Sequence, residues 1–365
     1  MLKWARSSVA LLLTVFLCLA SGCSSRAVAQ EPKSTQTFSV GCDVVNKVED
    51  GIRIQTAIPV FTGFSAAKGL NEKIRKVSDD GIAELKQTAK ELGVSPAEGT
   101  LYYQSYYDYV WDNDVLSVWI SNENYSGGAH GLRWITSFNL NITTGEFYKT
   151  PGDLFKDSDA GTKLVTDKII TDIQKQSIGF FPEAVQTVRD KKGNDSFYLD
   201  GQNLVVYYDL YEITPYAAGI PFFKIPLANL ETKLRLGGNP PMGDVRVDGM
   251  NTTFNHKVIS NDNGVFLPLK ETGDALCINV LEKDGKYTVN GKSVQPTMID
   301  SVAYMPIQYY NDLLESDAIK GFAVYDGNVL RMFTQTEESA VSGAVSENPL
   351  GSTVTSSVTE TVETK

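Results

Sequence analysis

Residues 101–121 read LYYQSYYDYVWDNDVLSVWIS. Aromatic and β-branched residues fill both halves of this stretch, which is typical of β-strands over 101–111 and 115–121. The polar pair Asn113-Asp114 separates the two halves and favours a tight hairpin turn. The stretch therefore predicts two neighbouring strands of an antiparallel sheet.

The segment before this hairpin predicts a strand and then a helix. Apolar and polar residues alternate from Ile52 to Ile58, which is the pattern of a half-buried strand. From Ala67 to Leu92 the apolar residues recur every three or four positions, and Gly93 follows. This spacing predicts an amphipathic helix with one buried face.

The segment after the hairpin continues the mixture. Strands are predicted over 132–142 and 196–213, and the Thr-Gly pair at 144–145 indicates another hairpin turn. A second helix is expected to begin after the Asp-Ser-Asp run at 157–159. Strands interleaved with two helices predict an α+β block over 38–236, built on a largely antiparallel sheet.

A Gly- and Pro-rich run at 237–241 introduces a second block, over 243–334. This block contains an internal repeat, because an aliphatic-Pro-aliphatic motif occurs at Pro268 and again 38 residues later at Pro306. Each copy continues with a helical pattern and then a turn-and-strand signal. The repeat predicts a small α+β domain made of two strand-helix-hairpin units.

The N-terminus has the pattern of an export signal. Lys3 and Arg6 precede an apolar run from Val9 to Ala20, which is short for a membrane-spanning helix. The run ends in Leu-Ala-Ser-Gly immediately before Cys23, and this resembles the lipobox of bacterial lipoproteins. The resemblance implies that Cys23 is lipidated and becomes the new N-terminus.

Three segments follow from this interpretation and from composition. We expect a signal peptide over 1–22, a polar tether over 23–37 and a disordered Ser-, Thr- and Glu-rich tail over 335–365. The mature chain would then lie outside the cytoplasmic membrane, held to it by the lipid anchor.

Charge and composition exclude several classes of protein. The 365 residues include 44 acidic and 33 basic side chains, a net charge of −11, which argues against a nucleic-acid partner. There are two histidines, His130 and His256, too few for a His-rich metal site, so no metal or cofactor is predicted. Cys42 and Cys277 lie in different blocks, and a disulfide between them is neither required nor ruled out.

The first block resembles a known extracellular family. The run NYSGGAH at 124–130, an apolar strand with Thr-Gly after it, and YEITPYAAG at 211–219 occur in that order. This combination is similar to the domains of unknown function in RsiV-like lysozyme-sensing anti-sigma factors, which also precede the catalytic domain of PdaC-like peptidoglycan deacetylases. The chain shows neither an anti-sigma segment nor a deacetylase domain, so we expect neither signalling output nor hydrolysis of those kinds.

The second block resembles the copper amine oxidase N-terminal-like (stalk) domain of Gram-positive surface proteins. The runs FLPL at 266–269 and YMPI at 304–307 match its repeated motif, and Cys277 stands where that family usually has glycine. Copper is not implied, because the block offers only His256 as an imidazole ligand.

The run Gly127-Gly128-Ala129-His130 is the sharpest candidate for a binding loop. Two glycines would let a ligand approach the backbone, with His130 as a polar contact, although a turn that only glycine can make explains the run more simply. With nearby aromatic residues, the loop gives the predicted ligand-binding set: Trp119, Tyr125, Gly127, Gly128, His130, Tyr208, Tyr211 and Tyr216.

Tyrosine occupies both odd and even positions within 102–109, so both faces of that strand are aromatic. One face can be core, and the other is either covered by a helix or exposed as a binding patch. The carboxylates Asp108, Asp112, Asp114, Asp209 and Glu212 could pair for glycosidic chemistry, but charges beside hairpin turns are more often solvated. No catalytic residue is therefore predicted.

Three hypotheses of function remain. The first is a non-catalytic envelope lipoprotein that binds cell-wall glycan (peptidoglycan) or a basic protein such as lysozyme, for which an acidic surface and tyrosine rings are suited. The second is a weak or accessory cell-wall hydrolase or deacetylase that uses His130 or a carboxylate pair. The third is a structural spacer at the cell surface.

Overall fold

The computed structural model describes residues 38–93, 100–176, 179–236, 242–315 and 320–335. The predicted signal peptide, Cys23, the tether, the breaker run at 237–241 and all but the first residue of the tail lie outside these ranges. None of the helices in the described ranges is both long and apolar enough to cross a lipid bilayer.

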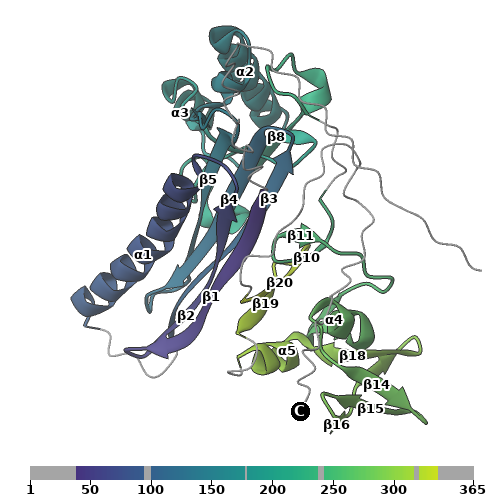
Figure 1. Cartoon of the computed structure of the whole chain (residues 1–365). Helices are drawn as coiled ribbons and strands as arrows, with labels where there is room; N and C mark the ends of the chain where they lie inside the picture. Colours follow the sequence, from purple (N-terminus) through teal and green to yellow (C-terminus); the bar gives the residue numbers. More distant parts are fainter. Residues whose placement is uncertain (1–37, 94–99, 177–178, 237–241, 316–319, 336–365) are drawn as a thin grey trace, which may run out of the picture. The chain divides into compact units, whose positions relative to one another are not determined.

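A six-stranded sheet forms the first half of the first block (Figure 1). Its strands follow chain order and are antiparallel except for β2 and β3, which run parallel because a helix connects them. The hairpin predicted around Asn113 is confirmed, and Asn113 adopts a positive φ of 54° in the turn. The strands are β1 (Ser39–Glu49), β2 (Ile52–Thr62), β3 (Leu101–Asp112), β4 (Val115–Tyr125), β5 (Leu132–Asn141) and β6 (Phe147–Tyr148).

The connecting helix α1 (Ala67–Glu91) confirms the helix predicted over 67–92. Its buried stripe, which includes Leu70, Ile74 and Leu85, packs on the sheet as the three- and four-residue spacing requires. Figure 1 shows α1 lying along the strands of this sheet.

A second, three-stranded sheet completes the first block, with β7 (Ser196–Leu199), β8 (Asn203–Tyr207) and β9 (Phe222–Pro226). The helices α2 (Ser158–Lys175) and α3 (Ala184–Asp190) share its hydrophobic core. The α+β class is confirmed. The second helix is present, but α2 begins at Ser158, within the Asp-Ser-Asp run and not after it, because Asp157 caps the helix by accepting a hydrogen bond from the amide of Ala160. The single strand predicted over 196–213 is wrong, because Asp200 caps a tight turn that folds the segment into a hairpin.

The second block confirms the predicted repeat of strand, helix and hairpin. The first copy is β13 (Gly264–Pro268), α4 (Leu269–Ala275) and the hairpin β14 (Val280–Lys283) with β15 (Lys286–Val289). The second copy is β18 (Val302–Pro306), α5 (Ile307–Leu314) and the hairpin β19 (Gly321–Tyr325) with β20 (Leu330–Thr334). The remaining strands are β10 (Val245–Val247), β11 (Met250–Asn251), β12 (Ile259–Asn261), β16 (Lys292–Val294) and β17 (Thr297–Ile299).

Cys42 and Cys277 do not form a disulfide with each other: Cys42 is buried and Cys277 is exposed. Cys277 adopts a positive φ of 54°, a conformation that favours glycine. This geometry explains why a glycine is expected at that point of the repeat.

The second block packs against the first sheet, so the part of the second face of β3 around Tyr106 and Asp108 is covered by strands and not by a helix. On that face Phe333 of β20 lies 6.5 Å from the ring of Tyr106, and Arg331 lies 5.2 Å from the centroid of the same ring. The pairing of β2 with β3 ends at Thr56 and Ser105, and beyond it Phe333 also lies 5.2 Å from the ring of Tyr107, on the other face of β3. A Cβ at Gly249 would come within 2.8 Å of the same ring, and Gly249 has a φ of +81°. Glycine is required there both for the turn and for the close approach.

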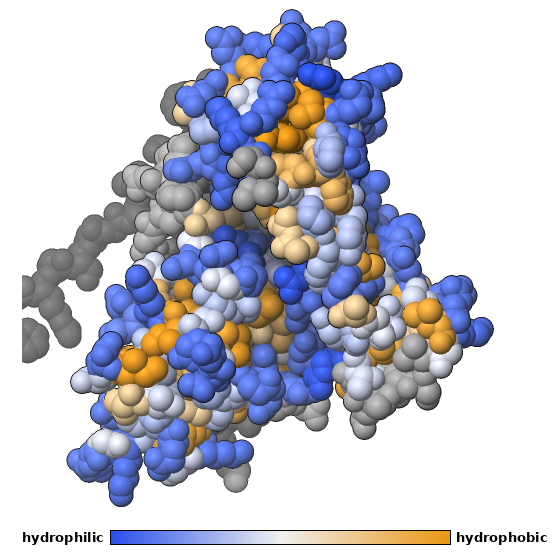
Figure 2. All heavy atoms as spheres, turned by 180° about the vertical axis from the view of Figure 1, so that it is seen from behind, coloured by the Kyte–Doolittle hydropathy of each residue, from blue (hydrophilic) through white to orange (hydrophobic). Residues whose placement is uncertain are grey.

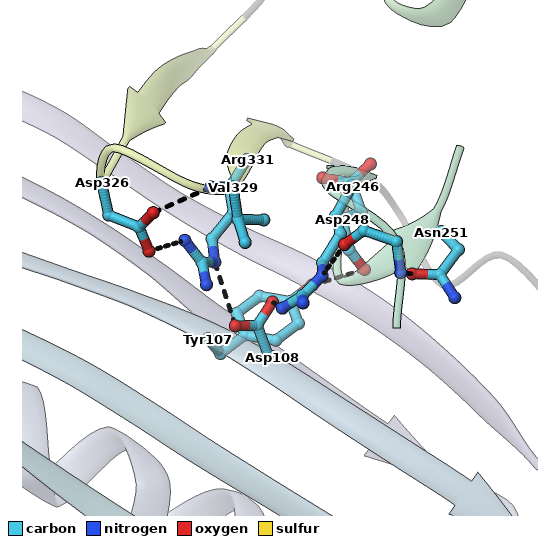
Figure 3. Close-up of polar contacts among 9 residues, drawn as sticks. Tyr107, Asp108, Arg246, Asp248, Asn251, Asp326, Val329 and Arg331 are labelled. Carbon is cyan, nitrogen blue, oxygen red and sulfur yellow. Dashed lines mark hydrogen bonds and ion pairs between the residues drawn. The ribbon is translucent and has the colours of Figure 1, made fainter. Parts of the chain in front are cut away.

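A buried ion network joins the two blocks (Figure 3). The carboxylate of Asp108, in β3, is 1% exposed. It forms ion pairs with Arg246 of β10 at 2.5 Å and with Arg331 of β20 at 2.9 Å. Arg331 also contacts Asp326 at 2.6 Å. Burial lowers the pKa of Arg331, but the carboxylates of Asp108 and Asp326 outweigh it and leave that pKa raised.

Candidate functional site

Few aromatic rings among the described residues are exposed. Figure 2 shows one face, on which hydrophilic side chains border separate apolar patches. Among the described residues, the large aromatic side chains classed as exposed are Tyr211, at 50%, and Phe222, at 45%. Tyr211 is one of the residues predicted to bind a ligand, so its surroundings are the first candidate site.

The structure brings four of the predicted residues together, Tyr211 among them. The rings of His130 and Tyr216 are stacked with centroids 3.7 Å apart, and Tyr211 lies 6.0 Å from Tyr216. Tyr125, at the end of β4, donates a hydrogen bond to the carbonyl of Gly128 in the same loop. We call His130, Tyr125, Tyr211 and Tyr216 the aromatic cluster.

Hydrogen bonds fix the orientation of the rings in the aromatic cluster. Tyr216 donates its hydroxyl proton to the carbonyl of Gly131 at 3.0 Å. Nδ1 of His130 lies 3.2 Å from the same carbonyl, which can only accept, so Nδ1 carries a proton. In the neutral ring Nε2 is then an acceptor for the hydroxyl of Tyr211 at 3.3 Å.

Of the two adjacent glycines in the loop, Gly127 has a backbone conformation that favours glycine and Gly128 does not. Gly127 has a φ of +96°, which explains a glycine at that position. A Cβ on Gly128 would meet nothing within 4 Å, so the space beside Gly128 is open. Tyr211 itself has a φ of +66°, which is strained for a bulky residue by about 1–2 kcal/mol.

A polar groove of about 380 Å³ lies beside the aromatic cluster. Tyr102 joins the two features, because its ring is stacked 6.0 Å from Tyr125 and also lines the groove. Its hydroxyl donates to Glu123 at 2.6 Å, and burial together with Glu123 raises the pKa of Tyr102. We define the polar groove by Arg53, Tyr102, Gln104, Glu123, Arg133 and Asp326.

Two residues predicted to bind a ligand lie in the core instead, which corrects that part of the prediction. Trp119 is 6% exposed and stacks on Tyr198 of β7 at 4.1 Å. Tyr208 is fully buried and donates its hydroxyl to Asp195 at 2.7 Å. Both rings pack one sheet or helix against another, so neither has surface left for a ligand.

The carboxylates considered for glycosidic chemistry are held by other groups. Asp108 is the centre of the ion network, and Asp114 accepts from Asn141 at 2.9 Å. Glu212 accepts from the amide of Asp209 and pairs with Lys191, and burial and then the charge of Glu212 raise the pKa of Asp209. In the described part of the chain, no group of three or more His, Cys, Asp or Glu side chains could hold a metal ion.

The polar groove escaped the sequence analysis. Its residues come from β2, β3, β4, β5 and the turn after β19, so no local spacing reveals them. Only the register brings them together, since Glu123 lies opposite Arg133 and Gln104 in neighbouring strands. The aromatic cluster was easier to find, because the runs at 124–130 and 211–219 are contiguous in sequence.

Two segments of the first block match family models of known proteins. Residues 45–133 match the family model described as Deacetylase PdaC, and residues 152–228 match the one described as Protein of unknown function (DUF3298). No curated protein matches the chain.

Two solved structures of the DUF3298 family resemble the chain. The protein from Bacteroides fragilis NCTC 9343 is 19% identical, with a TM-score of 0.33, and the match covers 53% of this chain and 92% of that one. The protein from Pseudomonas aeruginosa PAO1 is 13% identical, with a TM-score of 0.35, covering 53% and 93%. The resemblance of the second block to a copper amine oxidase stalk domain stays a prediction. In the first block, a segment similar to the PdaC family is followed by a segment similar to the DUF3298 family.

Proposed function

We propose that this chain is a non-catalytic binding protein of the cell envelope that binds cell-wall glycan through the aromatic cluster. Tyrosine and histidine rings offer stiff contact area with polar tips, which suits sugar rings that present both C–H faces and hydroxyls. The cluster contains residues of both matched domains, with His130 in the first and Tyr211 and Tyr216 in the second.

One observation carries the proposal: Tyr211 combines exposure with backbone strain. Its side chain is half exposed, and its φ of +66° strains the backbone, a strain that glycine in its place would relieve. A ring that is costly to hold at the surface and contributes little to the core is best explained by contact with a ligand.

The proposal includes export and lipid anchoring at Cys23, which rest on the sequence pattern at the N-terminus. Cells grown with a labelled fatty acid should label the wild-type chain and not the Cys23→Ala variant. Equal labelling of the two would remove the anchor from the proposal.

We expect the Tyr211→Ala variant to bind purified sacculi at least about fivefold more weakly than wild type, because one stacked ring is lost, about 1 kcal/mol. Co-sedimentation of the purified chain with sacculi measures this. Tyr211→Phe keeps the ring and should bind almost as well. Phe222→Ala removes a similarly exposed aromatic ring outside the cluster and should bind like wild type.

The other outcomes point to other functions. Equal sedimentation of Tyr211→Ala and wild type would show that the cluster does not bind glycan. Binding to lysozyme and not to sacculi, weakening steeply with salt, would favour a basic protein partner, as the net charge of −11 allows. Acetate released from sacculi by wild type and not by His130→Ala would favour an accessory deacetylase, to which the name of the first matched family points.

A further inference from the structure

The polar groove and the aromatic cluster form one continuous surface. A Cβ at Gly131 would lie 3.3 Å from the hydroxyl of Tyr102 and 3.5 Å from Oε1 of Glu123, both of which line the groove. The carbonyl of the same Gly131 accepts from Tyr216 in the cluster. Only Gly131 therefore separates a ligand in contact with Tyr216 from the groove.

The side chains of the groove alternate in charge and are held in place by one another. Arg133 donates to Glu123 at 2.7 Å, and Tyr102 donates to the other oxygen of the same carboxylate. Asp326, in the turn after β19, also lines the groove and accepts a hydrogen bond from Arg331. Charges of both signs, fixed in advance, suit a ligand whose groups both donate and accept hydrogen bonds.

Neutral hydroxyl groups have this double character, whereas a charged peptide or an anionic ligand would favour a groove of one sign. The amide of Gln104, which donates to Gln55 at 3.1 Å, and the ring of Tyr106 add planar polar and aromatic surface to the same groove. Its volume of about 380 Å³ falls in the range of small-molecule sites, roughly 300–1,000 Å³.

We propose that the polar groove is a second set of binding positions for a linear glycan, and that the chain of sugars continues from the aromatic cluster along the groove towards Arg53 and Asp326. This inference rests on the proposed function and adds the requirement for several linked sugar rings. The second block contributes Asp326 to one wall, so a complete groove needs both blocks.

The test is the dependence of affinity on glycan length. We would titrate the purified full-length chain with β-1,4-linked N-acetylglucosamine oligomers of two to six sugars by calorimetry. Affinity should rise at least tenfold from the shortest to the longest oligomer, because only long oligomers reach the groove. Tyr211→Ala should weaken all lengths.

A matched pair of variants separates the groove from the cluster. Arg53→Gln removes a groove side chain that is 41% exposed and has a distant partner, Glu315 at 3.8 Å. Arg75→Gln removes a side chain that is 50% exposed and paired with Asp43, away from the groove. Arg53→Gln should weaken the six-sugar oligomer at least threefold and leave the two-sugar oligomer unchanged, while Arg75→Gln should change neither.

Each of the other possible outcomes contradicts a specific part of the proposal. If affinity stays equal at all lengths while Tyr211→Ala still weakens binding, the groove is not part of the site and the proposed function survives. If Arg53→Gln and Arg75→Gln have the same effect at every length, the groove assignment also fails. If no oligomer and no sacculi bind the wild type, the proposed function fails and the groove assignment fails with it.

Discussion

We expect the Asp108→Ala variant to lose about 3–5 kcal/mol of unfolding free energy, because it leaves two guanidinium groups buried without their shared carboxylate. Arg246 and Arg331 are each 8% exposed, and both point to Asp108 (Figure 3). Denaturant unfolding followed by tryptophan fluorescence would measure the loss.

Asp43→Ala is the matched control for this substitution. Asp43 also lies in the first sheet and pairs with an arginine, Arg75 at 2.7 Å, but the two side chains are 33% and 50% exposed. An exposed pair of this kind contributes about 0–1 kcal/mol. Equal losses from Asp108→Ala and Asp43→Ala would contradict the view that the buried network holds the two blocks together.

A triple replacement tests a separate point. Breaking a buried pair is costly, but replacing all of its members by apolar side chains of similar size is often neutral. We therefore expect Asp108→Leu combined with Arg246→Met and Arg331→Met to recover most of the lost stability. The triple variant should still disturb the polar groove, because Arg331 no longer holds Asp326.

The sequence predicted the elements with local signals and missed the contacts between distant segments. The helix over 67–92 and the repeat around Pro268 and Pro306 were predictable, because periodicity and turn residues are properties of a short window. Tyrosines on both faces of β3 indicated that both faces needed cover. One face is covered by α1, which was predictable, but the cover at Tyr106 on the other face comes from β20, more than 200 residues away. Asp108 looked solvated because its partner Arg331 is 223 residues distant.

The same distinction applies to the candidate site. His130 and Tyr211 were found because each belongs to a contiguous glycine- or aromatic-rich run. Trp119 and Tyr208 were assigned wrongly to the site, because composition does not tell a buried aromatic residue from an exposed one. The groove depends on strand register and on the packing of the second block, and neither can be read from residue spacing.

The second large effect should appear at Asp248, in the turn between β10 and β11 that meets the first sheet. Burial raises the pKa of Asp248 from 3.8 to about 6, although hydrogen bonds from Thr334 and Cys42 oppose the increase. The folded state therefore binds the proton more tightly than the unfolded chain. The resulting stabilisation is complete below about pH 4 and is lost as the pH rises through 6, about 3 kcal/mol in all.

Asp248→Asn removes this titration but keeps a carbonyl that can accept from the amide of Thr334, as Asp248 does at 2.8 Å. We expect the variant to gain up to about 3 kcal/mol relative to wild type between pH 4 and pH 7.5, because only wild type must bury a charge at neutral pH. Denaturant unfolding at a series of pH values measures the difference in unfolding free energy between the variant and wild type. The contributions of the other carboxylates are the same in both proteins and cancel.

Asp284→Asn is the control. Asp284 also precedes a glycine in a hairpin turn, with a φ of 53° against 50° for Asp248, but it is exposed. Its effect should be equal at all pH values, and a pH-independent effect of Asp248→Asn would mean that the second block does not bury Asp248 against β1 and β3 in solution.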